Sequence, residues 1–176
     1  VCLLGHARMP TKGSSQDNAN NHPIFAGRTI GIHNGFIRND DFLFARYEFP
    51  RCGEVDSEII FRLLDNINPI SHNGTYYCLV EKRINLLNGL FATLSVDLRR
   101  PTRLLVLKNL MPLCLHYEER LKALFFSSRY LFLRQAFGRS VSTEALPAGQ
   151  GFCFEAERLP ALGQTPIYAF PIKCQS

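Results

Sequence analysis

The chain has 176 residues, 46% of them hydrophobic and 20% charged, and this size and composition fit one globular domain and exclude a disordered chain. Its formal net charge of +5 suggests nucleic acid as a partner, but the basic residues are dispersed and no DNA- or RNA-binding motif accompanies them. No apolar run approaches the length of a membrane-spanning helix. We therefore expect no nucleic acid and no membrane among its partners.

The first half of the chain predicts strands followed by helices. Residues 1–8 form an apolar run that predicts a buried strand, and a long polar loop follows at 9–23. Residues 28–33 alternate in hydrophobicity, which predicts a second strand that ends at a turn formed by Asn34 and Gly35. Apolar side chains then recur at helical spacing, and the predicted helices span residues 42–47, 56–66 and 75–87.

The second half consists of short apolar or alternating runs separated by turn residues, which is typical of an antiparallel meander. The predicted strands span residues 90–98, 103–108, 113–117, 123–127 and 151–156, and a short helix is predicted near 128–137. Helices combined with antiparallel strands predict an α+β fold built in layers. Residues 1–160 are predicted to form one domain, and residues 161–176 a tail or the start of a further element.

The cysteines and histidines do not predict a metal site. Six cysteines are present, but none forms a C-x-x-C pair or has a histidine at zinc-site spacing, and we expect no metal and no cofactor. Cys2, Cys114 and Cys153 lie in apolar runs, which predicts core thiols. His22 and His33 are predicted to be loop and strand-end residues. Because no secretory signal precedes the cysteines, we expect a reducing, cytoplasmic location.

Two residues after the first predicted strand carry groups that bind carboxylates. Arg8 offers a planar guanidinium, which matches a carboxylate with two parallel hydrogen bonds, and the hydroxyl of Thr11 is a further donor for the same group. A strand-end arginine in solvent or in an internal ion pair is the simpler interpretation. Both interpretations stay open from these residues alone.

Three further residues have a structural and a functional interpretation each. Asn34 and Gly35 are typical of a tight turn, but an asparagine amide beside a glycine N–H also supplies the two converging donors of an oxyanion hole. Glycine permits the close approach of a substrate to the backbone. Asp56 precedes a predicted helix, so its carboxylate either caps that helix or pairs with a substrate ammonium group.

The order of the motifs favours the functional interpretation. They are Gly-His-x-Arg-x-x-Thr-x-Gly at residues 5–13, His-Asn-Gly at 33–35, and Asp-Ser-Glu at 56–58, where a helix opens. Together they resemble the class II glutamine amidotransferase domain, a member of the N-terminal-nucleophile hydrolases. The stretches at 89–92 and 124–128 are similar to the closing half of that family, so the resemblance covers nearly the whole chain.

The resemblance implies a fold, a reaction and a set of site residues. The fold is an αββα sandwich of two antiparallel sheets between helix layers. The family hydrolyses the side-chain amide of L-glutamine to glutamate and passes the ammonia to an acceptor, which implies an acceptor-activating domain or subunit as a partner. By this resemblance Arg8 and Thr11 bind the α-carboxylate of glutamine and Asp56 binds its ammonium group, while the side chain of Asn34 and the amide of Gly35 form the oxyanion hole.

The chain also departs from the family. Met9 stands where several members carry an aromatic residue, and Lys12 where the glucosamine-phosphate synthases carry histidine. The family's nucleophile is an N-terminal cysteine whose α-amino group serves as the base, and we expect it upstream of Val1. Cys2 does not replace it, because an extended strand at about 3.3 Å per residue separates it from Arg8 by roughly 20 Å.

These departures lead to two expectations about activity. We expect the fold to be incomplete at its N-terminus and this chain alone to be inactive. The alternative is a non-catalytic module of the same fold that binds glutamine or regulates a partner enzyme. A basic nucleic-acid-binding domain is supported only by the sequence pI near 9.0.

Overall fold

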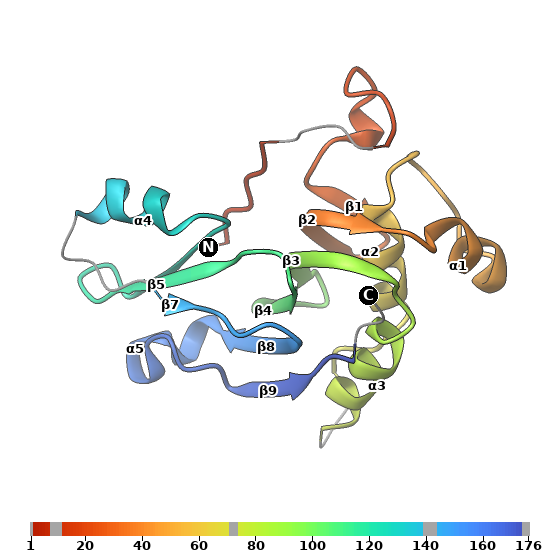
Figure 1. The fold of residues 1–176 in the computed structure, drawn as a ribbon. Coiled ribbons are helices and arrows are strands. Elements are labelled where there is room, and N and C mark those ends of the chain that lie inside the picture. The colour runs from red at the N-terminus through yellow and green to blue at the C-terminus, as the bar shows by residue number, and fades with distance from the viewer. Residues whose placement is uncertain (1, 8–11, 71–73, 139–143, 174–176) are drawn as a thin grey trace.

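The structure is a computed structural model, which describes residues 2–7, 12–70, 74–138 and 144–173. Two antiparallel sheets lie at its centre (Figure 1). The larger sheet has six strands in the order β1-β2-β3-β4-β8-β9, and the smaller sheet has three in the order β6-β5-β7. Neighbouring strands are antiparallel in both sheets.

The elements alternate between strands and short helices along the chain. The strands are β1 (Ile24–Ala26), β2 (Thr29–Ile37), β3 (Gly89–Asp97), β4 (Arg100–Asn109), β5 (Cys114–Glu118), β6 (Ala123–Ser127), β7 (Glu144–Ala145), β8 (Gln150–Glu155) and β9 (Tyr168–Pro171). The helices are α1 (Asp40–Tyr47), α2 (Ser57–Asp65), α3 (Thr75–Ile84), α4 (Tyr130–Phe137) and α5 (Leu159–Leu162), with single 3₁₀ turns η1 (Asn18–Asn20) and η2 (Ala156–Arg158).

The sheets and helices stack in layers. Successive side chains of a strand point to opposite faces, and in the smaller sheet Leu115 and Phe126 pack in a core shared with the larger sheet. On its other face, His116 and Phe125 contact Phe137 of α4. Helices α2 and α3 pack through a separate core against the outer face of the larger sheet. The layer order is helix, sheet, sheet, helix, which confirms the predicted α+β sandwich.

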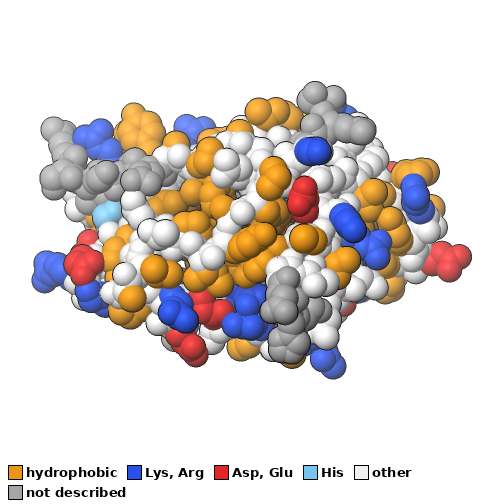
Figure 2. Space-filling view, turned by 90° about the horizontal axis from the view of Figure 1, so that it is seen from below, with side chains coloured by type: hydrophobic (Ala, Val, Ile, Leu, Met, Phe, Trp, Pro, Cys, Tyr) orange, Lys and Arg blue, Asp and Glu red, His pale blue; other side chains and the backbone are white. Residues whose placement is uncertain are grey.

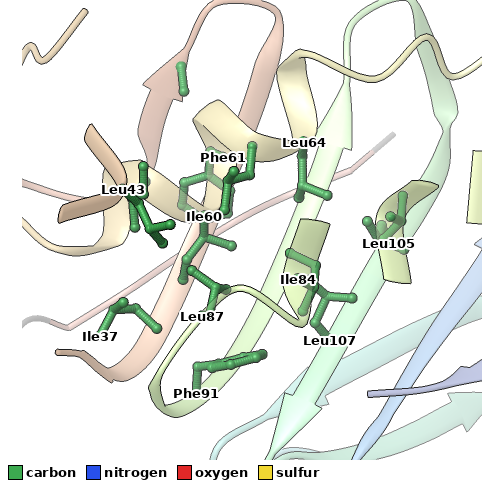
Figure 3. Packing of buried hydrophobic residues seen from close by; sticks show 14 of the residues in the cluster. Ile37, Leu43, Ile60, Phe61, Leu64, Ile84, Leu87, Phe91, Leu105 and Leu107 are labelled. Carbon is green, nitrogen blue, oxygen red and sulfur yellow. The ribbon is translucent and has the colours of Figure 1, made fainter. Parts of the chain in front are cut away.

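The core between the helices and the larger sheet brings α2 close to β2 (Figure 3). Phe61 of α2 is fully buried and lies over Gly31 of β2, where an added Cβ would stand only 2.2 Å from the Phe61 ring. A larger residue at position 31 would therefore push the helix away. The absence of a side chain at Gly31 sets the short distance between the strand and the helix.

Glu58 organises the loop that leads into α2. Its side chain lies in the first turn of the helix and is 1% exposed. The carboxylate accepts hydrogen bonds from the backbone N–H groups of Cys52 and Gly53, and it forms an ion pair with Arg62 at 2.7 Å. A buried carboxylate with these three partners is fully compensated for its loss of water.

Several sequence-based expectations about the strands are wrong. Residues 2–7 are not a strand, and Cys2 is exposed rather than a core thiol, while Leu3 is 95% exposed. A segment becomes a strand where a neighbouring strand offers hydrogen bonds, and no strand pairs with residues 2–7 in the described part of the chain. Cys114 and Cys153 are buried, as predicted.

The predicted meander is also wrong, although its strands exist. β5 and β6 are not part of the larger sheet. They pair with each other, and β5 also pairs with β7, whereas β8 returns to pair with β4. Local hydrophobic runs predict that a segment is extended, but the choice of its partner depends on contacts between distant segments.

The C-terminal segment forms one edge of the larger sheet. β9, in the segment predicted to be a tail or the start of a further element, pairs with β8 through Tyr168–Pro171. Hydrophobic side chains gather on the face seen from below in Figure 2, with lysines and arginines among them. The exposed large hydrophobic residues of the chain include Leu162, Ile167 and Tyr168 from this segment. The domain division after residue 160 stays a prediction.

The buried Glu58 gives a stability prediction. Glu58→Ala should lower the free energy of unfolding by about 3–5 kcal/mol, because it leaves the Arg62 guanidinium and two backbone N–H groups without their partner. Urea denaturation followed by circular dichroism measures the change. Glu157→Ala is the matched control, since Glu157 is exposed. An equal loss for both variants would contradict the role of Glu58.

Candidate functional site

The candidate site lies where the end of β2 meets the start of α2. In the described part of the chain, β1 pairs with β2 only from Thr29 to Gly31, so the edge of β2 beyond Gly31 has no strand partner on that side. The N–H of Ile37 donates a 2.6 Å hydrogen bond to Oδ2 of Asp56 instead. The first residues of α2 therefore close the end of this strand with a carboxylate.

Asp56 does not act as a helix cap. It occupies the N-cap position of α2, but its side chain makes no capping hydrogen bond, and the capping interpretation is wrong. Asp56 is 6% exposed, and no ion pair joins it to a cation in the part of the chain that the structure describes. A buried carboxylate with an N–H donor on one oxygen and no cation of its own can accept an ammonium group.

The surroundings of Asp56 raise its pKa. Burial is the main cause, and the nearby charge of Asp40 adds to it, while the N–H of Ile37 and the charge of Lys12 act in the opposite direction. The carboxylate therefore takes up a proton at a higher pH than an ordinary aspartate. A cation bound beside Asp56 would favour its ionised form.

A cluster of charged residues borders the site at the start of α1. Lys12 and Arg51 both contact Oδ2 of the buried Asp40, at 2.7 and 2.9 Å. Both also pair with Asp41, and the hydrogen bonds that Arg51 and Lys12 donate to its carboxylate hold the pKa of Asp41 below its ordinary value. These ion pairs hold Lys12 at the start of α1, where Asp40 follows Ile37 by three residues, near the end of β2 that Asp56 contacts.

The predicted carboxylate-binding residues cannot be compared with this geometry. Arg8 and Thr11 lie outside the described residues, as does Met9. Lys12, which directly follows Thr11 in the sequence, is described and lies in the charged cluster next to the site. The role of Arg8 and Thr11 stays a prediction.

Asn34 and Gly35 are not a turn but the interior of β2. Asn34 pairs with Ala92 and Gly35 with Phe91 of β3, so the predicted strand end is wrong. Gly35 has a φ of 130°, and an added Cβ would lie 1.9 Å from the carbonyl oxygen of Leu90. Only glycine fits there. The asparagine–glycine pair that resembled a turn is therefore required by a close approach between two strands.

Asn34 lies on the opposite face of β2 from α2. Residues at positions 31 and 33 face the helix, since Gly31 contacts Phe61 and His33 bonds to Ser57. Alternation along the strand then places Asn34 on the face toward the smaller sheet, where it is half-buried. Asn34 and Gly35 thus lie in the second half of β2, and Asp56 of α2 contacts the end of the same strand at Ile37.

Asn20 is a positioning residue that the sequence did not reveal. It is fully buried, its Nδ2 donates to the carbonyl of Ser14 at 3.1 Å, and its Oδ1 accepts from the N–H of Glu54 at 2.7 Å. These bonds hold the loop after Lys12 against the loop before Asp56. An asparagine in a polar loop carries no signal of burial, so only the structure could identify it.

The described residues include neither a metal-binding cluster nor a membrane-spanning helix. They contain no group of three or more His, Cys, Asp or Glu residues arranged to hold a metal. The five cysteines described are free thiols. No helix among the described residues is long and apolar enough to span a bilayer. A cavity of about 460 Å³ lies between the start of β4, the end of β8 and the segment that follows β8. It is lined by Arg100, Glu155, Arg158, Leu162, Pro166 and Ile167, none of which belongs to the candidate site.

The fold is shared with an enzyme of known structure. The glutamine phosphoribosylpyrophosphate amidotransferase of B. subtilis matches 90% of this chain with a TM-score of 0.66, and the match covers 33% of that protein. The two sequences are 17% identical, so this likeness shows a common fold. No family model matches the chain.

Curated relatives show the resemblance in sequence as well. A 7-cyano-7-deazaguanine synthase from Saccharolobus solfataricus is 34% identical over 106 residues, which cover 60% of this chain and 22% of that protein. A glutamine–fructose-6-phosphate aminotransferase (isomerizing) from Shigella flexneri is 28% identical over 145 residues, covering 75% of this chain and 23% of that protein. The chain thus spans about a fifth of the length of these relatives.

Together, fold and sequence confirm the resemblance to class II glutamine amidotransferase domains. The similarity to glutamine amidotransferases extends over most of the chain, and it supports the general class of protein.

Gly35 provides a prediction for the site. Backbone strain at a positive φ costs a non-glycine residue about 1–3 kcal/mol. Gly35→Ala should lower the free energy of unfolding by more than this, because the new Cβ would also clash with the Leu90 carbonyl oxygen. Gly74→Ala is the matched control, since Gly74 also has a positive φ of 76° but has nothing within 4 Å of an added Cβ. Thermal and urea unfolding compare the two variants, and equal losses would show that the contact with Leu90 is unimportant.

Proposed function

We propose that the chain is the glutaminase part of a glutamine amidotransferase, which hydrolyses the side-chain amide of L-glutamine to glutamate and ammonia. The observation that carries this proposal is Asp56, a buried carboxylate that forms no ion pair with the described residues. It is held by the N–H of Ile37 at the end of the strand that contains Asn34 and Gly35. The fold and sequence resemblance to glutamine amidotransferases supports it.

In the proposed reaction each site residue has one task. Asp56 pairs with the α-ammonium of glutamine, and Arg8 and Thr11 bind its α-carboxylate. A cysteine thiolate attacks the side-chain amide carbon, and the developing oxyanion accepts hydrogen bonds from the Asn34 side chain and the Gly35 N–H. The α-amino group of that cysteine, which has taken up the thiol proton, returns it to the departing nitrogen, so that ammonia leaves as a thioester forms. Water then hydrolyses the thioester to glutamate and the free thiol.

The nucleophile is the part of the proposal that depends on the resemblance alone. We propose that it is an N-terminal cysteine, as in the family, and that this chain by itself does not turn over glutamine. The ammonia acceptor, and the domain or subunit that activates it, belong to the same proposal. Cys2 is exposed and lies on a segment that is not part of either sheet, so its exclusion as the nucleophile stays a prediction.

The proposal is tested on the protein expressed from its whole reading frame. Incubation with L-glutamine should release equal amounts of ammonia and glutamate, measured by coupled enzyme assays. Stabilisation against heat by glutamine without release of ammonia would instead support the non-catalytic glutamine-binding module. If the protein neither hydrolyses glutamine nor is stabilised by it, both functions are contradicted.

Asp56 gives the sharpest mutational prediction. Asp56→Asn should raise the KM for glutamine by about ten- to a hundredfold, since hydrogen bonds to charged groups contribute about 1.5–3 kcal/mol. The value of kcat should change less, because the ammonium group is remote from the reacting amide. Glu157→Gln, at an exposed position, is the control and should leave KM unchanged. An unchanged KM in Asp56→Asn would remove Asp56 from the proposed site.

The raised pKa of Asp56 gives a pH prediction. The ionised carboxylate binds the ammonium group, so affinity falls as the pH falls through the pKa of Asp56. Because burial raises that pKa, the loss should begin at a higher pH than for an ordinary aspartate. The pH profile of kcat/KM measures this limb, and Asp56→Asn should abolish it. A limb that persists in Asp56→Asn would assign it to another group.

A further inference from the structure

The side chains at the start of α2 turn away from their own helix and toward β2. Asp56 is at the N-cap position and Ser57 is the first helical residue, yet α2 has no side-chain cap. Capping side chains typically stabilise a helix by about 0.5–2 kcal/mol. Here the carboxylate of Asp56 accepts from Ile37, and the hydroxyl of Ser57 bonds to Nδ1 of His33 at 2.8 Å. Both polar groups that could cap the helix join it to the strand.

The two bonds enclose the predicted oxyanion hole. His33 directly precedes Asn34 in β2, and Ile37 lies two residues after Gly35. Asn34 and Gly35 therefore lie between two points at which the strand is tied to α2. A third contact, the packing of Phe61 on Gly31, holds the same strand two residues before His33. Sliding of β2 along the helix would break all three contacts.

The bond between His33 and Ser57 is shielded from water. Each residue is 3% exposed, and Nε2 of His33 is also buried. Burial, together with the nearby charges of His22 and His6, lowers the pKa of His33 to about 3, so the ring is neutral at physiological pH. A neutral imidazole has one donor and one acceptor nitrogen, and a hydroxyl can serve either. Because Nε2 is buried and Nδ1 bonds to Ser57, neither ring nitrogen of His33 is exposed for a substrate.

We propose that His33 and Ser57 are positioning residues, whose hydrogen bond sets the oxyanion donors of β2 at a fixed distance from Asp56 on α2. This inference rests on the proposed function, because it assigns the bond a role in binding and orienting glutamine. A misplacement of about 1 Å between such groups costs up to a hundredfold in rate. The bond between His33 and Ser57 thus sets the distance between the oxyanion donors and Asp56, which are predicted to bind the two ends of glutamine.

The test compares two buried serines in the protein expressed from its whole reading frame. Ser57→Ala removes the bond to His33, and Ser57→Thr keeps a hydroxyl at the same place. Ser95→Ala is the control, because Ser95 on β3 is 2% exposed and its hydroxyl donates to the carbonyl of Leu105 on β4, so the substitution leaves the hydrogen bonds between β2 and α2 in place. Unfolding in urea shows whether the variants lose similar stability.

The kinetic outcome distinguishes positioning from stability. Ser57→Ala should lower kcat/KM for glutamine by about tenfold or more, while Ser57→Thr recovers most of it and Ser95→Ala changes it by less than about threefold. If Ser57→Ala and Ser95→Ala have equal kinetics, the bond serves stability only and the inference is overturned.

A second measurement keeps the inference testable if the proposed function fails. The N–H of Ile37 is protected by Asp56, so its hydrogen exchange reports whether β2 stays in place against α2. Ser57→Ala should speed this exchange more than Ser95→Ala does at equal global stability. A protein that does not hydrolyse glutamine would contradict the proposed function, whereas unchanged exchange at Ile37 would contradict the role of His33 and Ser57.

Discussion

The hydrogen bond from the N–H of Ile37 to the buried carboxylate of Asp56 is the interaction on which the candidate site depends. It joins a strand edge that has no strand neighbour in the described part of the chain to the start of a helix that has no side-chain cap. Phe61 can approach closely enough to permit this bond only because position 31 is glycine. Close packing and a polar junction therefore support each other: the apolar contact sets the distance, and the hydrogen bonds set the register.

Charge is distributed around this junction in a way that suits a zwitterionic ligand. Asp40 and Asp41 are paired with Lys12 and Arg51, and Glu58 with Arg62, so these carboxylates are neutralised within the protein. Asp56 is buried beside them and has a backbone N–H on one oxygen. Among the described residues, these carboxylates have a cationic partner and Asp56 has none, which is a physical reason to select Asp56, independent of any resemblance.

Spacing alone predicted α1, α2 and α3 and most of the strands, because apolar periodicity records which face of an element is buried. The same reasoning failed where the decisive contact was remote in sequence. Asn34 and Gly35 look like a turn locally, but β3 pairs along the whole of β2 and the Leu90 carbonyl requires glycine at position 35. Residues 2–7 look like a buried strand, but no described strand pairs with them.

The sequence by itself determined the class of fold, the order of the motifs and the chemical groups of the candidate site, since these follow from residue types and their spacing. Only the tertiary structure decided how those groups are used. Asp56 and Ser57 could have capped their helix, and they bond to β2 instead because the strand edge brings Ile37 and His33 within reach. A side chain's partner is set by which groups lie near it in space, and a linear sequence does not contain that distance.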